Sequence, residues 1–219
     1  MMGGASLNYA SCLKGSSMRH LRFVPAAVLM TFLAASSAFA VPFKVDPAHS
    51  SVSFTVQHIF SQVHGQFNSF DGAYDFDAKT KAVKDVTFTI KAASLTTNHA
   101  KRDAHLNSPD FFNTAEFPDI QFKAEKISRS KNGSYRLTGP LTLHGVTKSV
   151  TFTGKFLGQA KNPWGQTVSA FSAATTISRK DFGMTWNKTL DNGGFLVGND
   201  VEVTVAIEGA AVTAPETGK

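Results

Sequence analysis

Residues 51–58 read SVSFTVQH, and this stretch decides the fold class of the chain. Apolar Val52, Phe54 and Val56, followed by His58, alternate with polar residues. Successive side chains of a β-strand point to opposite faces, so one face of this segment is apolar and the other is polar. Strict alternation of this kind predicts a half-buried antiparallel strand with one face toward a core.

The same period of two recurs along the rest of the chain. It is found in VTFTI (86–90), DIQFKAEKI (119–127), YRLTGPLTL (135–143), VTFTGKF (150–156) and VEVTVAIE (201–208). Turn residues separate the runs: Asn132-Gly133 predicts a type I′ hairpin, His144-Gly145 predicts another hairpin, and NPWG (162–165) is a longer turn. We predict about eight short-linked strands in one all-β domain, which is either a sandwich or a closed barrel.

Two segments break the alternation. Residues 97–106 are predicted to form a short helix capped by Thr97 or Asn98, and Ser108-Pro109 is predicted to begin a second turn. The other break is DFGMTWNKTLDNGG, residues 181–194. Helical excursions of this kind are expected to close or line one end of a barrel.

The first forty residues have the pattern of a secretory signal peptide. Arg19 and Arg22 precede the apolar run FVPAAVLMTFLAA (23–35), and Ala-Phe-Ala at 38–40 is an A-x-A-type cleavage site. The apolar run has thirteen residues, whereas a membrane-spanning helix needs about 20. We therefore predict a cleavable signal peptide over residues 1–40.

The ends of the chain are predicted to lie outside the folded domain. Met18 is an alternative start, because the residues before it have no signal character, and residues 211–219 are predicted to be a flexible tail. Cleavage removes Cys12, which is the only cysteine, so disulfides are not expected.

Composition after cleavage argues against several partners. The chain from residue 41 onward keeps 19 Lys/Arg and 16 Asp/Glu, a formal net charge of +3. No basic run carries interleaved aromatic residues, so nucleic acid is not expected as a partner. No long amphipathic helix is predicted, so stable membrane insertion is not expected either.

The segment KRDAHL (101–106) combines Arg102, Asp103 and His105, as a catalytic cluster would. On a helix, Arg102 and His105 are neighbours while Asp103 points elsewhere, so an Asp–His dyad has poor geometry. The chain has no G-x-S-x-G motif and no cysteine after cleavage. We predict no catalytic residues here: the polar side chains fix the excursion to the barrel rim or, alternatively, contact a ligand head group.

The histidines do not have the spacing of metal ligands. His58 and His64 flank a turn, but the chain has no H-x-H or H-E-x-x-H motif and no paired carboxylates at ligand spacing. We predict no metal site and no cofactor.

Seven stretches together resemble the YceI family of exported lipid- and polyisoprenoid-binding proteins. They are DPAHSSVSFTVQH (46–58), VHGQFNSFDGAYDFD (63–77), RDAHLNSPDFFNTAEFPDIQFKA (102–124), LTGPLTLHGVTKSVTF (137–152), NPWG (162–165), ISRKDFGMTWN (177–187) and GGFLVGNDVEVTVAIE (193–208). The resemblance implies an extended eight-stranded antiparallel lipocalin-like β-barrel over residues 41–210, with one or two short helical excursions. It also implies a periplasmic location, an isoprenoid or other long-chain lipid in an apolar pore, and no established catalytic activity.

The alternation indicates which side chains face the pore. The predicted lipid-binding residues are Phe54, Val56, His58, Phe67, Phe88, Ile90, Phe122, Leu141, Phe152, Phe171, Val203 and Val205. A polar head group is predicted at a mouth formed by Arg102, His105, Arg179 and Trp186. Periodicity does not report interior volume, so the sequence leaves open whether the phenylalanines fill a solid core or line a hollow one.

The function predicted from these observations is that of a periplasmic binding protein that carries, stores or scavenges an isoprenoid-type lipid. Two alternatives stay open at this stage: an enzyme acting on a bound isoprenoid, and a stress-response interaction module whose pore is only a feature of folding. Assembly into a homodimer is also left open.

Overall fold

The structure is a computed structural model that describes residues 40–191 and 193–212. The predicted signal peptide, apart from residue 40, and residues 213–219 of the predicted tail lie outside the described residues. The tail was predicted to begin at residue 211, whereas Ala211 is the last residue of a strand and pairs with Phe43.

The described chain consists mainly of β-strands, with one α-helix and three short 3-10 helices labelled η. In chain order the elements are β1 (Val41–Val45), η1 (Pro47–His49), β2 (Ser51–His58), β3 (Ser61–Phe67), β4 (Phe70–Phe76), β5 (Val83–Lys91), η2 (Ala92–Ser94), β6 (Leu95–Thr96), α1 (Ala100–Asn107), β7 (Asp119–Lys123), β8 (Lys126–Arg129), β9 (Ser134–Leu143), β10 (Val146–Lys161), β11 (Thr167–Ser178), η3 (Arg179–Phe182) and β12 (Val197–Ala211).

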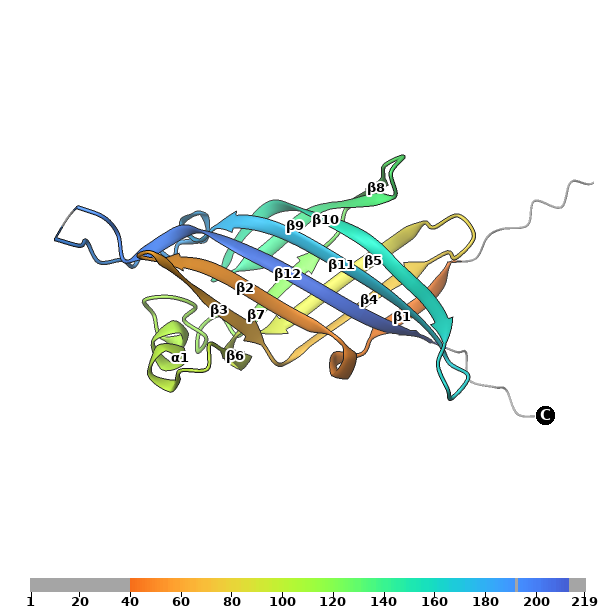
Figure 1. The fold of residues 1–219 in the computed structure, drawn as a ribbon, viewed down its shortest axis with the longest axis horizontal. Helices are drawn as coiled ribbons and strands as arrows, with labels where there is room; N and C mark the ends of the chain where they lie inside the picture. Colours follow the sequence, from red (N-terminus) through yellow and green to blue (C-terminus); the bar gives the residue numbers. More distant parts are fainter. Residues whose placement is uncertain (1–39, 192, 213–219) are drawn as a thin grey trace, which may run out of the picture. The chain divides into compact units, whose positions relative to one another are not determined.

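These strands form an eight-stranded antiparallel barrel (Figure 1). Four of the eight strands are interrupted: η1 separates β1 from β2, residues 68–69 separate β3 from β4, η2 separates β5 from β6, and residues 124–125 separate β7 from β8. The order around the barrel is β1/β2, β3/β4, β5/β6, β7/β8, β9, β10, β11 and β12, and β12 pairs back onto β1 and β2. The barrel is therefore closed, as the resemblance implied, and the sandwich is ruled out.

The stretch SVSFTVQH forms β2, and its register explains the alternation seen in the sequence. Val52 pairs with Phe67 on β3 and with Val205 on β12, so inward residues of three neighbouring strands meet side by side. Val52 is 1% exposed, and Phe54 and Phe67 are also buried. The apolar face of β2 thus packs into the barrel, as predicted.

The two predicted hairpins differ in turn type. His144 and Gly145 both have positive φ, 52° and 72°, which is the type I′ geometry between β9 and β10. At the other hairpin only Gly133 is left-handed, with φ of 86°. The type I′ prediction for Asn132-Gly133 is therefore wrong, because the Asn132 side chain accepts a hydrogen bond from the Ser134 N–H and stabilises a different turn.

The helical excursions also differ in detail from the predictions. α1 begins at Ala100, and its N-cap is His99, whose ring nitrogen accepts a hydrogen bond from the Arg102 N–H at 3.3 Å. The predicted caps at Thr97 or Asn98 are therefore wrong. Residues 108–112 form turns without a second helix, and among the described residues of the other excursion only those of η3 are helical.

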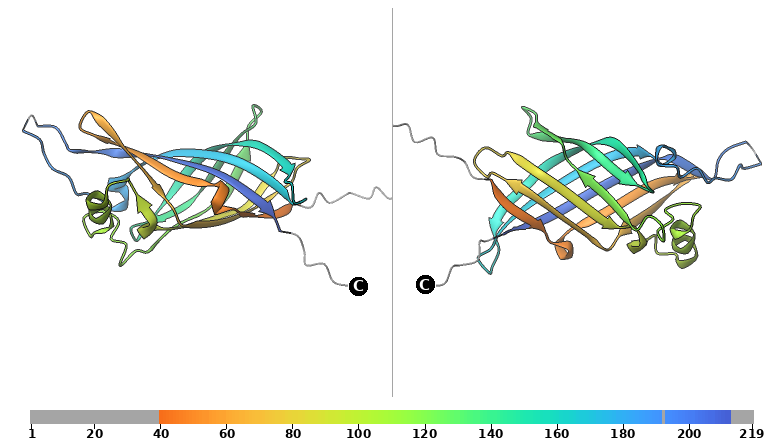
Figure 2. Two further views of the ribbon diagram at one scale, coloured as in Figure 1. Left: turned by 60° about the horizontal axis from the view of Figure 1, so that its bottom comes forward. Right: turned by 180° about the vertical axis from the view of Figure 1, so that it is seen from behind.

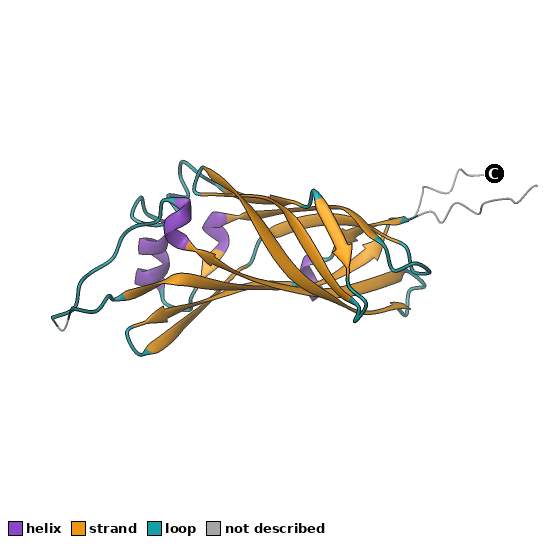
Figure 3. Cartoon of the chain, turned by 90° about the horizontal axis from the view of Figure 1, so that it is seen from above, coloured by secondary structure: helices purple, strands orange, loops and turns teal. Residues whose placement is uncertain are grey.

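The two ends of the barrel have different coverings (Figures 2 and 3). α1 and residues 183–191 and 193–196 lie at one end, which we call the α1 end. The β10–β11 hairpin and the turn between β4 and β5 lie at the opposite end. Among residues 40–191 and 193–212, no helix has the length and hydropathy needed to cross a membrane.

Candidate functional site

The barrel encloses an apolar cavity with a volume of about 220 Å³. Its wall is contributed by strands from all around the barrel, and carbon atoms make up almost all of the cavity surface. An engineered apolar cavity of about 150 Å³ stays dry and binds benzene, so a void of this size and lining is able to hold an apolar guest. The inward-facing side chains therefore leave the core hollow in this part of the barrel.

Eleven of the twelve predicted pore residues line this cavity, and His58 does not. The eleven are Phe54, Val56, Phe67, Phe88, Ile90, Phe122, Leu141, Phe152, Phe171, Val203 and Val205. His58 has the inward parity of β2, but it is the last residue of that strand and pairs with Ser61 at the β2–β3 hairpin. Its partner on β12, Val197, does line the cavity, so His58 lies at the edge of the lined region.

Glycines on neighbouring strands allow the inward rings to lie along the barrel wall. Gly65 pairs with Phe54, and Gly72 pairs with Phe88. A Cβ on Gly65 would lie 2.3 Å from the Phe54 ring, and a Cβ on Gly72 would lie 2.5 Å from the Phe88 ring. Each ring thus occupies space that a side chain would otherwise fill. Sequence reasoning missed these glycines, because their effect depends on strand register.

The end opposite α1 is filled by a group of rings that we call the terminal aromatic cluster: Phe43, Tyr74, Phe76, Phe156 and Phe171. The ring of Phe76 lies 4.9 Å from Phe156 and 5.2 Å from Phe171, measured between centroids. Phe43 stacks on Tyr74 at 5.4 Å. Phe43 and Phe76 are each 1% exposed and do not line the cavity, so the hollow part of the barrel ends at this cluster.

The hydroxyl of Tyr74 is held by Ser169 on β11. It donates to the Ser169 carbonyl oxygen at 3.1 Å and shares a hydrogen bond of 2.8 Å with the Ser169 hydroxyl. Burial raises the pKa of Tyr74 to about 12, so the phenol is neutral at physiological pH. This polar pair therefore keeps one ring of the terminal aromatic cluster in a fixed position.

The α1 end of the cavity is covered by Leu106, Phe111, Phe112 and Met184. Phe111 and Met184 are buried, and the ring of Phe112 packs against Phe67 at a centroid distance of 5.8 Å. The sequence contained a sign of this covering in the paired phenylalanines that follow the helical segment. It did not show that Met184 would line the same end of the cavity.

Arg102 and Asp103 hold α1 to the preceding residues through Thr97. The Arg102 guanidinium donates from Nε to the Thr97 hydroxyl at 2.7 Å and from Nη2 to the Thr97 carbonyl at 2.9 Å. Asp103 accepts from the Thr97 N–H at 2.8 Å and from the Thr96 hydroxyl at 3.0 Å. Burial opposes ionisation of Asp103, but the hydrogen bonds from Thr97 and Thr96 outweigh it and lower the pKa of Asp103.

Ring contacts of His105 and Trp186 connect α1 to the segment that follows η3 at the α1 end. Their rings meet edge to face at 4.8 Å, and Phe111 lies 5.0 Å from His105 and 5.1 Å from Trp186. A ring nitrogen of His105 also shares a 2.8 Å hydrogen bond with Asp110. Neither His105 nor Trp186 lines the cavity, and Arg102 does not line it either.

Arg179 is the one predicted head-group residue that lines the cavity, and it is buried rather than at a rim, with 3% exposure. Its Nε donates to the Gly198 carbonyl at 2.8 Å, and its Nη1 donates to the carbonyls of Met184 and Trp186 at 2.8 and 2.7 Å. Burial lowers the pKa of Arg179. Its Nη2 has no hydrogen-bond partner within the described residues. Arg179 therefore fastens the segment after η3 to the start of β12.

The fold and the cavity together define the class of protein: a closed antiparallel β-barrel built around an apolar cavity. A family model described as the YceI-like domain matches residues 43–209, and the chain belongs to this family.

Three known proteins illustrate the relationship. Protein YceI of Escherichia coli is 39% identical over 178 residues, which are 80% of this chain and 90% of that protein. The crystal structure of a Campylobacter jejuni YceI protein matches with a TM-score of 0.64 and 30% identity, over 72% of this chain and 90% of that chain. The structure of a polyisoprenoid binding domain from Saccharophagus degradans matches with a TM-score of 0.55, over 79% of this chain and 99% of that chain, and its 12% identity shows a shared fold alone.

Proposed function

We propose that the protein is a periplasmic binding protein that holds the chain of an isoprenoid or other long-chain lipid in the barrel cavity, without chemical turnover. The observation that carries this proposal is the cavity inside the barrel, whose surface is almost entirely carbon. Transfer of apolar surface out of water contributes about 25 cal/mol per Å², so an apolar chain has a large driving force to enter.

Two further observations support this function. The chain belongs to the YceI-like family, and a protein that shares its fold is described as a polyisoprenoid binding domain. The predicted signal peptide over residues 1–40 supports export to the periplasm. The eleven predicted pore residues that line the cavity are proposed to contact the lipid chain, and head-group contact by Arg102, His105, Arg179 and Trp186 stays a prediction.

The geometry of the α1 end favours binding over catalysis. The side chains of Arg102, Asp103 and His105 are engaged with neighbouring residues, and none of the three lines the cavity. A general base must lie within hydrogen-bond reach of the atom it deprotonates, and these groups are not placed beside the cavity in that way. We therefore propose no catalytic residue.

The test is native mass spectrometry of the protein purified from its own cells, followed by unfolding of the delipidated protein with and without a C40 isoprenoid. We expect one co-purified long-chain lipid per chain. A ligand at a hundredfold excess over its Kd stabilises the folded state by about 2.7 kcal/mol. A protein that carries no lipid and is not stabilised by the isoprenoid would instead be an interaction module. Turnover of a prenyl substrate that is lost in His105→Ala would show an enzyme.

A further inference from the structure

A second pocket opens in the side of the barrel between β5 and β8. Its volume is about 590 Å³, and polar and apolar side chains line it in similar measure. Its lining includes Lys81, Lys84 and Arg129, together with Asp85 and Glu125. The cavity, in contrast, has protein across both ends: the terminal aromatic cluster at one and the α1 covering at the other. The side pocket is therefore a polar opening in the wall of a barrel whose two ends are covered.

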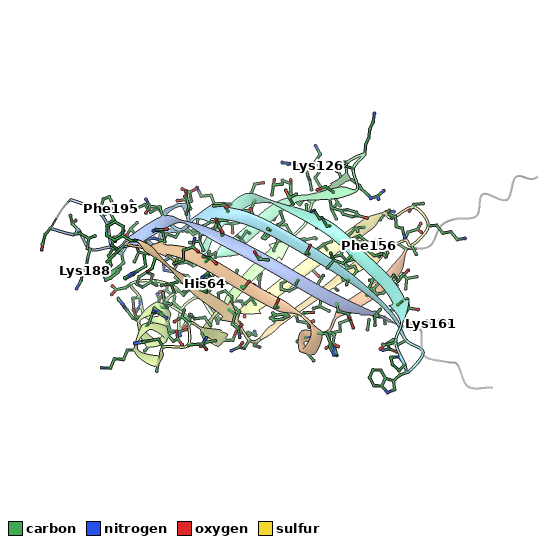
Figure 4. The ribbon with its side chains drawn as sticks, in the orientation of Figure 1. His64, Lys126, Phe156, Lys161, Lys188 and Phe195 are labelled. Carbon is green, nitrogen blue, oxygen red and sulfur yellow. The ribbon has the colours of Figure 1, made fainter. Side chains whose placement is uncertain are left out.

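The pocket exists because β8 leaves the barrel wall. β5 pairs with β7 from Thr87 to Lys91, while its first residues pair only with β4. The last contact across this seam is the Ala124 N–H to the Val86 carbonyl at 3.0 Å, after which β8 pairs only with β9. Figure 1 shows β8 standing away from β5, and Figure 4 labels Lys126 at its start.

Gly139-Pro140 on β9 favours this separation. A Cβ on Gly139 would lie only 1.9 Å from the Lys123 carbonyl oxygen, so the chain crosses β9 closely at the point where β7 ends. Pro140 follows at once and has no N–H to donate to a neighbouring strand. The break between β7 and β8 therefore lies opposite the two residues of β9 that are least able to maintain a regular ladder.

The side pocket and the apolar cavity share part of their lining. Val83 and Tyr135 line both, and the Tyr135 side chain is buried between them. The Tyr135 hydroxyl donates to the Lys81 carbonyl at 2.7 Å, and its ring lies 6.0 Å from Phe171. Tyr135 thus stands at the junction of an apolar interior and a polar opening, which matches a guest that has an apolar chain and a polar end.

Positive charge is concentrated around this opening. The bordering segments 79–85 and 123–136 carry eight Lys/Arg and two Asp/Glu, a net charge of +6. The other residues from 41 onward carry eleven Lys/Arg and fourteen Asp/Glu, a net charge of −3. Within the described residues, none of Lys81, Lys84 and Arg129 forms an ion pair with a carboxylate. Lys81 lies over the Phe156 ring and Arg129 over the Tyr135 ring, and neither contact cancels the positive charge. Cations without a carboxylate partner raise the local concentration of anions.

We propose that the side pocket between β5 and β8 binds the anionic head group, a phosphate or pyrophosphate, of the lipid whose chain occupies the cavity. This inference rests on the proposed function. Lys84 and Arg129, one on each side of the opening, would donate charge-assisted hydrogen bonds to the phosphate oxygens. The chain would enter past Tyr135 and Val83, so the lipid would be held with its head at the side of the barrel. This site is an alternative to the head-group contacts predicted for Arg102, His105, Arg179 and Trp186 at the α1 end, and the two exclude each other.

The test compares three probes on the delipidated protein: geranylgeranyl pyrophosphate, geranylgeraniol and inorganic pyrophosphate. Kd is measured by calorimetry for the wild type and for Lys84→Gln/Arg129→Gln. We expect the wild type to bind the prenyl pyrophosphate at least tenfold more tightly than the alcohol. The double variant should lose most of that preference and keep its affinity for the alcohol, since only the head group loses contacts.

Lys180→Gln/Lys188→Gln is the matched control. It removes two cations at the α1 end, and all four side chains are exposed. We expect the control to keep the wild-type preference. A preference lost in this control and retained in Lys84→Gln/Arg129→Gln would place the head at the α1 end and overturn the proposal.

The remaining outcomes separate this inference from the proposed function. Equal binding of alcohol and pyrophosphate by the wild type would overturn the head-group site and leave the carrier function standing. Absence of binding by both prenyl compounds would contradict the carrier function for prenyl chains. Inorganic pyrophosphate binding as tightly as the prenyl compound would show a site for free phosphate that is not coupled to the cavity.

A labelling experiment provides a second readout that does not depend on the charge variants. The chain from residue 41 onward has no cysteine, so Ser128→Cys places a single thiol in the lining of the side pocket. Geranylgeranyl pyrophosphate should slow its alkylation several-fold and leave Ser149→Cys, on the exposed face of β10, unaffected. Equal alkylation rates with and without the lipid at Ser128→Cys would count against a head group in this pocket.

Discussion

Phenylalanines face inward along the whole barrel, but the two regions use them differently. In the terminal aromatic cluster, Phe76 is 1% exposed and touches other rings at centroid distances of 4.9 and 5.2 Å. In the hollow region, Phe88 and Phe122 are only half-buried and line the cavity. The same residue type thus fills space in one region and borders it in the other, so inward alternation alone does not report a filled core.

The largest expected effect is a difference in stability between these two regions. Phe76→Ala should lower the free energy of unfolding by about 3–5 kcal/mol, because a new cavity replaces close contacts. Phe88→Ala and Phe122→Ala should each cost about 1–2 kcal/mol, since part of each ring already borders a void.

Denaturant unfolding of the delipidated proteins measures all three variants, and calorimetry with the C40 isoprenoid measures binding. Phe88→Ala and Phe122→Ala should weaken lipid binding, because the guest loses an aromatic wall. A full core penalty in both, together with no stabilisation of the wild type by the isoprenoid, would show that the barrel is filled.

A smaller effect is expected when a methyl group is added in each region. A Cβ on Gly209 would lie 2.3 Å from the Tyr74 hydroxyl oxygen, and that side chain is held by Ser169 and stacked on Phe43. Gly209→Ala should therefore cost about 1–3 kcal/mol, as overpacking does in a rigid core.

The matched variant is Gly72→Ala, where the added Cβ meets the Phe88 ring at 2.5 Å. Phe88 borders the cavity and is able to turn into it, so the loss of stability should be under about 1 kcal/mol while lipid affinity falls. Thermal unfolding and lipid titration measure the two quantities. Similar losses of stability in the two glycine variants would mean that the wall near Phe88 is as rigid as the terminal aromatic cluster.

The smallest effect is expected at η1, which joins β1 of the filled region to β2 of the hollow region. His49 Nδ1 lies 2.7 Å from an Asp46 carboxylate oxygen, and this hydrogen bond raises the pKa of His49 above 6.5. A histidine whose pKa is raised by folding contributes its full stabilisation at pH values below its pKa in the unfolded chain. This stabilisation is lost as the pH rises through its pKa in the folded protein. Stability should therefore fall slightly above about pH 6.5 in the wild type.

The His49→Ala variant tests this assignment, because it should lack the small decline while β1 and β2 keep their pairing with β12. Urea unfolding between pH 5.5 and 8.5 in the two proteins provides the comparison. An identical decline in His49→Ala would assign the pH dependence to another group.

Strand positions were predictable because alternation is a local property. Val52, Phe54 and Val56 have their pattern whatever the rest of the chain does, and so do the residues of the later strands. This is why eleven of the twelve predicted inward residues line one cavity. His58 has the inward parity but does not line the cavity, because parity is local and the set of side chains that border a cavity is not.

The side chains of the predicted mouth are engaged in contacts that the alternation pattern does not contain, some within a few residues and some between separate segments. Arg102 faces Thr97, and Trp186 meets His105 from the far end of the sequence. Arg179 is buried among three backbone carbonyls that follow it in the chain. Charge and chain position made each of these residues a reasonable candidate for a head group, but the partners that occupy their side chains are set by tertiary packing.

The amino-acid sequence by itself determined where the antiparallel strands lie, which of their faces is apolar and where turns separate them. These features depend on side-chain alternation and turn chemistry, which act over a few residues. Only the tertiary structure decided that the barrel is hollow near Phe88 and filled near Phe76, and that β8 leaves the wall beside β5. Interior volume depends on which rings meet across the barrel and on which glycines lie beneath them. These contacts between side chains are set by strand register and barrel closure. Register and closure bring together residues more than a hundred positions apart, such as Gly209 and Tyr74.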